Sequence, residues 1–122
     1  MSAIPIAEDV LDPAVEVLTL RQVADKFGRP VSRVEQALRE GQLIAVRRNR
    51  ELLVPAIFLT EDNEVVKGLA GTITVLNDSG YSPSEILRWL FTADDTLPGM
   101  PIEALRGDRG REVKRRAQAM AF

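Results

Sequence analysis

The segment LTLRQVADKFGRPVSRVEQALREGQL, residues 18–43, predicts two short helices joined by a tight turn. Thr19 is followed three residues later by Gln22, which is a capping-box pattern, and apolar residues then recur at helical spacing. Gly28 is suited to end this first helix in a left-handed conformation, and Pro30 cannot continue it. The first helix therefore ends just before the pair Arg29-Pro30.

A second helix is predicted to start at Ser32, where Glu35 completes another capping box. Val34, Ala37 and Leu38 face inward at helical spacing, and Gly41 ends the helix. Two short helices joined by a few residues, with a glycine at the break, are typical of a helix-turn-helix.

The next segment, LIAVRRNRELLVP at residues 43–55, predicts a β-hairpin. Two apolar runs, Leu43–Val46 and Leu52–Val54, flank the polar segment Arg47–Glu51. Asn49 is placed in the turn because asparagine tolerates a positive φ. A hairpin directly after a helix-turn-helix is a wing.

The remaining sequence predicts a helical C-terminal part. A helix is expected from Asn63 to the stretch 77–80, and a third capping box, Ser82 with Glu85, opens another. The segment 101–105 is expected to form a short helical turn, and a final helix starts near Asp108. We predict a mainly α fold with a small β-hairpin, in which a winged helix-turn-helix is joined to a C-terminal helical domain. The predicted bounds are 1–17 for a flexible acidic tail, 18–60 for the winged helix-turn-helix and 61–122 for the helical domain.

Composition excludes several function classes. The 122 residues contain no Cys and no His, which removes disulfides, thiolate metal sites and the commonest general base. The sequence contains no Gly-rich phosphate loop and no apolar run long enough to span a bilayer. We therefore expect a cytoplasmic protein that is not an enzyme, with no catalytic residues, no cofactor, no metal and no membrane association.

Charge is distributed in blocks along the chain. Residues 21–50 carry eight bases and three acids, a net +5, and residues 106–122 carry six bases and two acids, a net +4. Residues 1–20 and 51–105 carry net −4 and −7, so the total is −2. A local positive field attracts an anion even when the whole molecule is slightly negative. The alternative is that the acidic and basic blocks neutralise one another within the fold.

The basic segment 21–50 points to duplex DNA as a partner. Arg33 and Gln36, on the outward side of the second helix, have the side chains that hydrogen-bond guanine and adenine edges. The wing concentrates three arginines within four residues, and a phosphate backbone or a narrow minor groove is an obvious counter-charge for them. The alternatives are an ordinary solvated helix face and a solubilising turn. The predicted DNA-binding residues are Arg21, Arg29, Ser32, Arg33, Gln36, Arg39, Arg47, Arg48 and Arg50.

Four stretches carry a resemblance to a known family. EDVLDP at 8–13, VSRVEQALREGQLIAVRR at 31–48, ILRWLF at 86–91 and REVKRRAQAMAF at 111–122 resemble the small actinobacterial winged-helix DNA-binding proteins. Members of this family join a helix-turn-helix to a C-terminal regulatory helical domain, and the resemblance implies a cytoplasmic transcriptional regulator. The winged helix resembles the MerR and excisionase type.

The C-terminal half leaves a second reading open. PIEALRGDRGREVKRRAQAM, residues 101–120, resembles the partner-binding domain of antitoxins of the Xre/MbcA/ParS group in its short helix, glycine turn and closing helix. This resemblance implies a protein-interaction module that binds a protein partner through residues 61–122. A recombination accessory factor is a third alternative, because excisionases share the wing.

Overall fold

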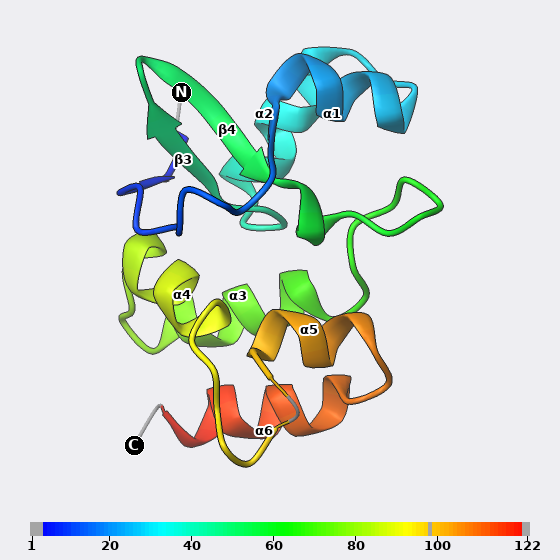
Figure 1. Cartoon of the computed structure of the whole chain (residues 1–122). Helices are drawn as coiled ribbons and strands as arrows, with labels where there is room; N and C mark the ends of the chain where they lie inside the picture. Colours follow the sequence, from blue (N-terminus) through cyan, green and yellow to red (C-terminus); the bar gives the residue numbers. More distant parts are fainter. Residues whose placement is uncertain (1–3, 98, 121–122) are drawn as a thin grey trace.

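The computed structural model describes residues 4–97 and 99–120 of the chain (Figure 1). The N-terminal half contains α1 (Leu20–Phe27), α2 (Val31–Arg39) and the short 3-10 helix η1 (Ala56–Phe58). It also holds a four-stranded sheet whose strands are β1 (Ile6–Ala7), β2 (Val17–Thr19), β3 (Ala45–Arg48) and β4 (Glu51–Pro55). The C-terminal half holds α3 (Leu69–Asp78), α4 (Pro83–Leu90), α5 (Pro101–Arg106) and α6 (Gly110–Ala119). The structure therefore combines a helix-turn-helix and a hairpin with a helical C-terminal half.

The helix-turn-helix forms as the sequence predicts at its first helix and its turn. The Thr19 hydroxyl accepts a hydrogen bond from the Gln22 N–H, and the Gln22 side chain accepts one from the Thr19 N–H. Gly28 has a φ of 63° and is the left-handed residue that ends α1. The prediction for the start of α2 is wrong by one residue, because α2 begins at Val31 with Pro30 as its N-cap and no side-chain cap. The proline already has the extended conformation that an N-cap requires, so the capping box predicted at Ser32 does not form.

The sheet is larger than the predicted hairpin. Its strand order is β1-β3-β4-β2, so the hairpin is central and the two outer strands come from the N-terminal segment. Strand β1 pairs in parallel with β3, and β2 pairs antiparallel with β4. The segment 1–17 was predicted as a flexible tail, but its described residues add β1 to the sheet and bury Ala7 and Leu11. A strand of two residues is too short to show the alternation of apolar and polar residues from which a strand is predicted.

The first helix of the C-terminal half starts later than predicted. The segment 60–68 is a turn region with one isolated bridge between Leu59 and Val65, and α3 begins only at Leu69. Asn63 and Gly68 have φ angles of 60° and 88°, which no right-handed helix can include. The apolar residues of this segment still reach the core, which is why the sequence pattern resembles a helix.

One continuous core joins the two halves. Phe58 of η1 is fully buried, and its ring centroid lies 5.9 Å from that of Phe91 after α4. From the other side, the guanidinium of Arg106 on α5 donates hydrogen bonds to the carbonyl oxygens of Ile57 and Leu59. Helix α4 also packs against β1. The C-terminal half therefore supports the sheet from below, and the helix-turn-helix points away from it (Figure 1).

Candidate nucleic-acid interface

The outward face of α2 is the first component of the candidate interface. Val34, Ala37 and Leu38 are buried, which fixes the rotation of the helix about its axis. The four residues predicted to point outward lie on the exposed side: Ser32, Arg33, Gln36 and Arg39. A nine-residue helix with one buried stripe leaves the opposite face to solvent or to a ligand.

A shallow groove brings several of these side chains together. Arg29 from the turn and Arg33 and Gln36 from α2 line it, with Phe27 at the end of α1. Ala37, Glu40 and Gln42 complete the lining. Sequence reasoning missed Glu40, although its position four residues after Gln36 indicates the same helix face. A carboxylate here is suited to accept a hydrogen bond from cytosine N4, so the groove offers donors and an acceptor.

Arg39 lies apart from this groove. It lines a cavity of about 200 Å³ between α2 and the C-terminal half, together with Leu43, Ile73 and Ile86. Arg21 is exposed on the first turn of α1 and does not line the groove either. Of the predicted DNA-binding residues, Arg29, Arg33 and Gln36 therefore line the groove, whereas Arg21 and Arg39 lie outside it.

The wing ends in a two-residue turn. Asn49 has a φ of 52°, as predicted, and Arg50 has a φ of 67°. Two successive positive φ angles between paired strands are the signature of a type I′ turn, whose second central position usually carries glycine. An arginine there adopts a left-handed conformation that residues other than Gly, Asn and Asp rarely visit. Arg47 and Arg50 are both exposed.

Arg48 differs from the other two wing arginines. In the register of the hairpin, Arg48 on β3 lies opposite Glu51 on β4. Because successive residues of a strand point to opposite faces, Arg47 projects to the other face of the hairpin. The Arg48 guanidinium binds both carboxylate oxygens of Asp9, with Nε 2.6 Å from Oδ2 and Nη2 3.1 Å from Oδ1. This hydrogen-bonded pair lowers the pKa of Asp9 and raises that of Arg48. The acidic N-terminal segment therefore neutralises one of the three wing arginines.

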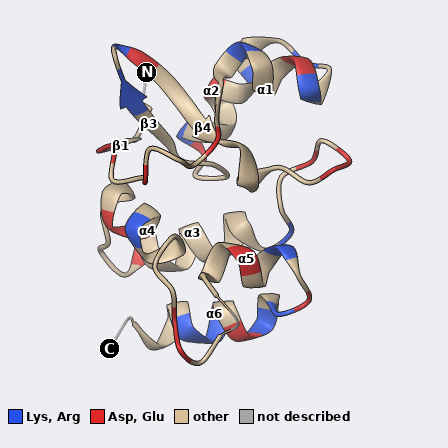
Figure 2. Cartoon of the chain, viewed as in Figure 1, with Lys and Arg blue, Asp and Glu red and all other residues tan. Residues whose placement is uncertain are grey.

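The groove and the wing tip lie at the same end of the molecule. Figure 2 shows Lys and Arg on the α1–α2 pair and at the tip of the β3–β4 hairpin, both on the side away from α3, α4, α5 and α6. Within residues 4–97 and 99–120 there are two ion pairs, Asp9 with Arg48 and Arg109 with Glu112. Arg29, Arg33, Arg47 and Arg50 take part in neither of them. Residues 21–50 carry eight bases and three acids, so this end is net positive although Glu40 shares the groove.

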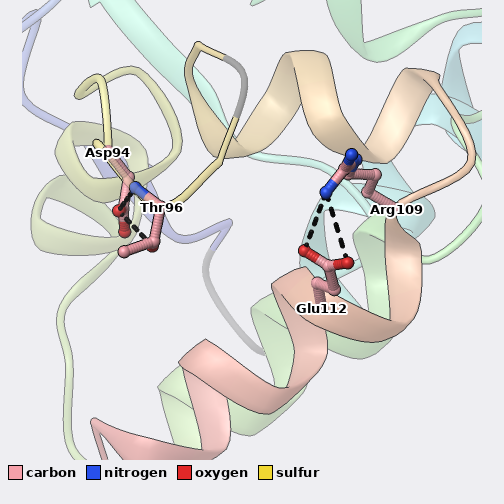
Figure 3. A network of polar contacts seen from close by, with 4 residues as sticks. All are labelled: Asp94, Thr96, Arg109 and Glu112. Atoms are coloured by element: carbon pink, nitrogen blue, oxygen red, sulfur yellow. Dashed lines mark hydrogen bonds and ion pairs between the residues drawn. The ribbon is translucent and has the colours of Figure 1, made fainter.

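The acidic residue Asp94 lies in a local hydrogen-bond network. The Asp94 carboxylate accepts hydrogen bonds from the Thr96 hydroxyl and from the Thr96 N–H, which lowers the pKa of Asp94 (Figure 3). No group of three or more Asp and Glu side chains able to hold a metal ion occurs among the described residues. In that same part of the chain, every helix is too short or too polar to cross a membrane.

Comparisons with known proteins place both halves of the chain in one family. Residues 3–59 match the family model "DNA-binding protein Rv2175c, wHTH domain", and residues 66–121 match "Rv2175c C-terminal domain of unknown function". The DNA-binding protein Rv2175c of Mycobacterium tuberculosis is 45% identical over 134 residues, which cover 100% of this chain and 92% of that protein. The NMR structure of Rv2175c superposes with a TM-score of 0.90, covering 99% of this chain and 91% of the other. These matches confirm the predicted winged helix-turn-helix family.

Proposed function

Because this chain belongs to the Rv2175c family, whose N-terminal part is a winged helix-turn-helix domain, we propose that it binds double-stranded DNA and regulates transcription without catalysing a reaction. One observation carries the proposal: the outward face of α2 and the wing tip, which are separate in the sequence, present arginines outside both ion pairs at the same, net positive end of the molecule.

The face of α2 is assigned to the major groove. Arg33 donates to guanine O6 and N7, and Gln36 hydrogen-bonds adenine N6 and N7. Glu40 lines the same groove of the protein surface as Arg33 and Gln36, where its carboxylate is positioned to accept a hydrogen bond from cytosine N4. Each bidentate contact of this kind contributes about 1–3 kcal/mol of discrimination between bases. The order of these side chains along α2 would set the order of the bases that they contact.

The surrounding residues are assigned to the phosphate backbone and the minor groove. Lys and Arg contacts to phosphate set the register of a protein on the duplex and carry no sequence information directly. Arg47 and Arg50 are exposed and project from the wing, whereas Arg48 must leave Asp9 before it reaches a phosphate. The backbone-contacting set is Arg21, Arg29, Ser32, Arg39, Arg47, Arg48 and Arg50.

Salt dependence tests the wing assignment. Neutralising about five phosphates gives a slope of log K against log[salt] near −4.5, and each contact removed reduces its magnitude by about 0.9. Arg47→Ala and Arg50→Ala are each expected to weaken binding to all duplexes and to flatten the slope by that amount. Arg88→Ala, which removes an exposed arginine from α4, is the matched control and leaves the slope unchanged. Wing variants with wild-type affinity and slope would contradict the assignment.

Base reading is tested by selecting bound sequences from random duplexes at two salt concentrations. The wild-type chain is expected to enrich a short motif, and Arg33→Ala is expected to lose preference at one base pair of it. An equal loss of affinity on every sequence would show that Arg33 contacts phosphate instead. A wild-type chain that retains no duplex at low salt would refute DNA binding as a whole.

Two finer likenesses stay predictions. The MerR-like and excisionase-like character of the wing rests on the sequence pattern of residues 18–60, and the antitoxin-like character of the helical half rests on residues 101–120. A pull-down with the full chain separates regulator from interaction module: capture of a protein partner without affinity for duplexes would favour the second.

A further inference from the structure

The exposed face of α6 carries three cations in one stripe. Arg111, Lys114, Arg115 and Gln118 are all exposed and recur at spacings of three and four, so they share one face of the helix. Val113 and Ala117 are fully buried on the opposite side. We call the stripe of Arg111, Lys114 and Arg115, with Gln118, the α6 cationic face.

The other arginines of α6 are engaged elsewhere. Arg109 precedes the helix and forms the ion pair with Glu112, with Nη1 3.2 Å from Oε2 (Figure 3). Arg116 is half-buried, and its charge helps to lower the pKa of Asp94. Neither ion pair within residues 4–97 and 99–120 includes a residue of the α6 cationic face. Lys67 extends the positive surface, because it lines a shallow groove with Arg111 and Lys114, to which Asp108 contributes one acid.

The α6 cationic face lies at the end of the molecule opposite the proposed DNA-binding end. Figure 1 shows α6 at the bottom of the fold, the helix-turn-helix and the wing tip at the top, and α3, α4 and α5 between them. Helix α6 packs on α3 and α5, which leaves its cationic face directed outward. A duplex is stiff over about 150 base pairs, so a segment bound at the top of this small domain does not fold back onto the bottom.

We propose that the α6 cationic face binds the phosphate backbone of a second DNA duplex, so that one chain bridges two duplex segments. The inference rests on the proposed function in one respect, namely that α2 and the wing hold the first duplex. Flexible cations on a convex helix contact phosphates without reading bases, so the second contact is independent of sequence.

The composition of this face favours a nucleic acid over an acidic protein. Protein interfaces depend on buried aromatic and apolar anchors surrounded by a polar rim. The exposed side of α6 offers charge and one amide but no aromatic or large aliphatic side chain. A polyanion with regularly spaced charges needs no such anchor, because the release of condensed counterions supplies its binding free energy.

A co-capture experiment tests the bridge. A biotinylated duplex is held on beads, the full chain is added, and the retention of a second, fluorescent duplex is measured. The wild-type chain is expected to retain the second duplex at low salt, and Arg111→Gln/Arg115→Gln is expected to retain about tenfold less, because two phosphate contacts are lost. Affinity of the same variant for a single short duplex, measured separately, is expected to stay within about twofold of wild type.

Arg111→Lys/Arg115→Lys is the matched control, since it changes the same two side chains and keeps both charges. This variant is expected to retain the second duplex as wild type does. Circular dichroism and thermal unfolding confirm that each variant is folded.

Three results would overturn the inference. The first is equal co-capture by the wild-type and Gln variants. The second is a wild-type chain that binds the immobilised duplex but never retains the second. The third is Arg111-dependent capture of a polyglutamate peptide in place of the second duplex, which would identify an acidic protein partner. A wild-type chain that fails to bind even the first duplex would contradict the proposed function itself, so the two failures are distinguishable.

Discussion

The contact between the two halves and the α2–wing end of the molecule use arginine in different ways. In the C-terminal half, Arg106 donates to two backbone carbonyls of the segment 57–59, and Arg109 pairs with Glu112. In the N-terminal half, Arg29 and Arg33 line a groove, and Arg47 projects from the wing. Of these, Arg106 joins the two halves, Arg109 forms an exposed surface pair, and the last three leave charge available to a ligand. A count of basic residues therefore locates a binding surface only after the structural arginines are subtracted.

Phe58→Ala tests most strongly whether the two halves form one cooperative unit. Phe58 is fully buried between the sheet and the C-terminal helices, beside Phe91. Truncating a buried phenylalanine lowers the free energy of unfolding by about 3–5 kcal/mol. Urea unfolding followed by Trp89 fluorescence and by circular dichroism is expected to show one transition that shifts to lower urea with both probes. A Trp89 signal that keeps its wild-type midpoint would show that the halves unfold independently.

Arg106→Leu tests the structural role of an arginine directly. The substitution removes the charged donor from the Ile57 and Leu59 carbonyls and is expected to lower the free energy of unfolding by about 1–2 kcal/mol, after allowance for the exposure of the guanidinium. Arg109→Leu is the comparison, because an exposed ion pair contributes only about 0–1 kcal/mol. If urea unfolding gave similar losses of unfolding free energy for the two variants, Arg106 would contribute no more to stability than the exposed Arg109–Glu112 pair does.

Arg50→Gly tests whether the wing sacrifices stability for function. Arg50 occupies a left-handed position of the type I′ turn, where glycine carries no steric cost. The variant is expected to raise the free energy of unfolding by about 0.5–1 kcal/mol and to weaken duplex binding. Asn49→Gly, at the neighbouring turn position, is the control for the added backbone freedom of glycine. A variant that is stabilised and binds DNA as wild type does would mean that Arg50 has no part in the interface.

Sequence reasoning succeeded where a local interaction determines the conformation. The caps at Thr19 and Ser82, the left-handed Gly28 and the turn at Asn49 follow from side chains that act within four residues of one another. The outward face of α2 follows from helical spacing in the same way. Glu40 lies four residues after Gln36, so the same spacing rule places it on this face, although the prediction did not include it.

The errors arose where a distant segment decides the conformation. The short strand β1 exists because β3 lies beside it, and two residues are too few to show a sequence pattern that would predict the pairing. Residues 63–68 have helical apolar spacing, yet positive φ angles at both ends of the segment exclude a helix. The Arg48–Asp9 pair joins residues 39 apart, so the three wing arginines looked equivalent in the sequence although one of them is neutralised.

Asp9→Asn, with the smallest expected effect, tests that neutralisation through pH. The hydrogen-bonded Arg48 guanidinium lowers the pKa of Asp9 below the ordinary value of an aspartate, so the native state favours the carboxylate. The pair therefore stabilises the wild-type fold fully above the unfolded-state pKa, and this contribution is lost as the pH falls through the lowered native pKa. Asparagine does not titrate, so the wild-type advantage in urea midpoint is expected to be constant from about pH 7 to 5 and to shrink below about pH 4. Glu16→Gln removes a negative charge from the same segment without breaking this pair and is the control. Parallel profiles for wild type and Asp9→Asn down to about pH 3 would mean that Arg48 is as available as Arg47, and the wing would then carry three free charges rather than two.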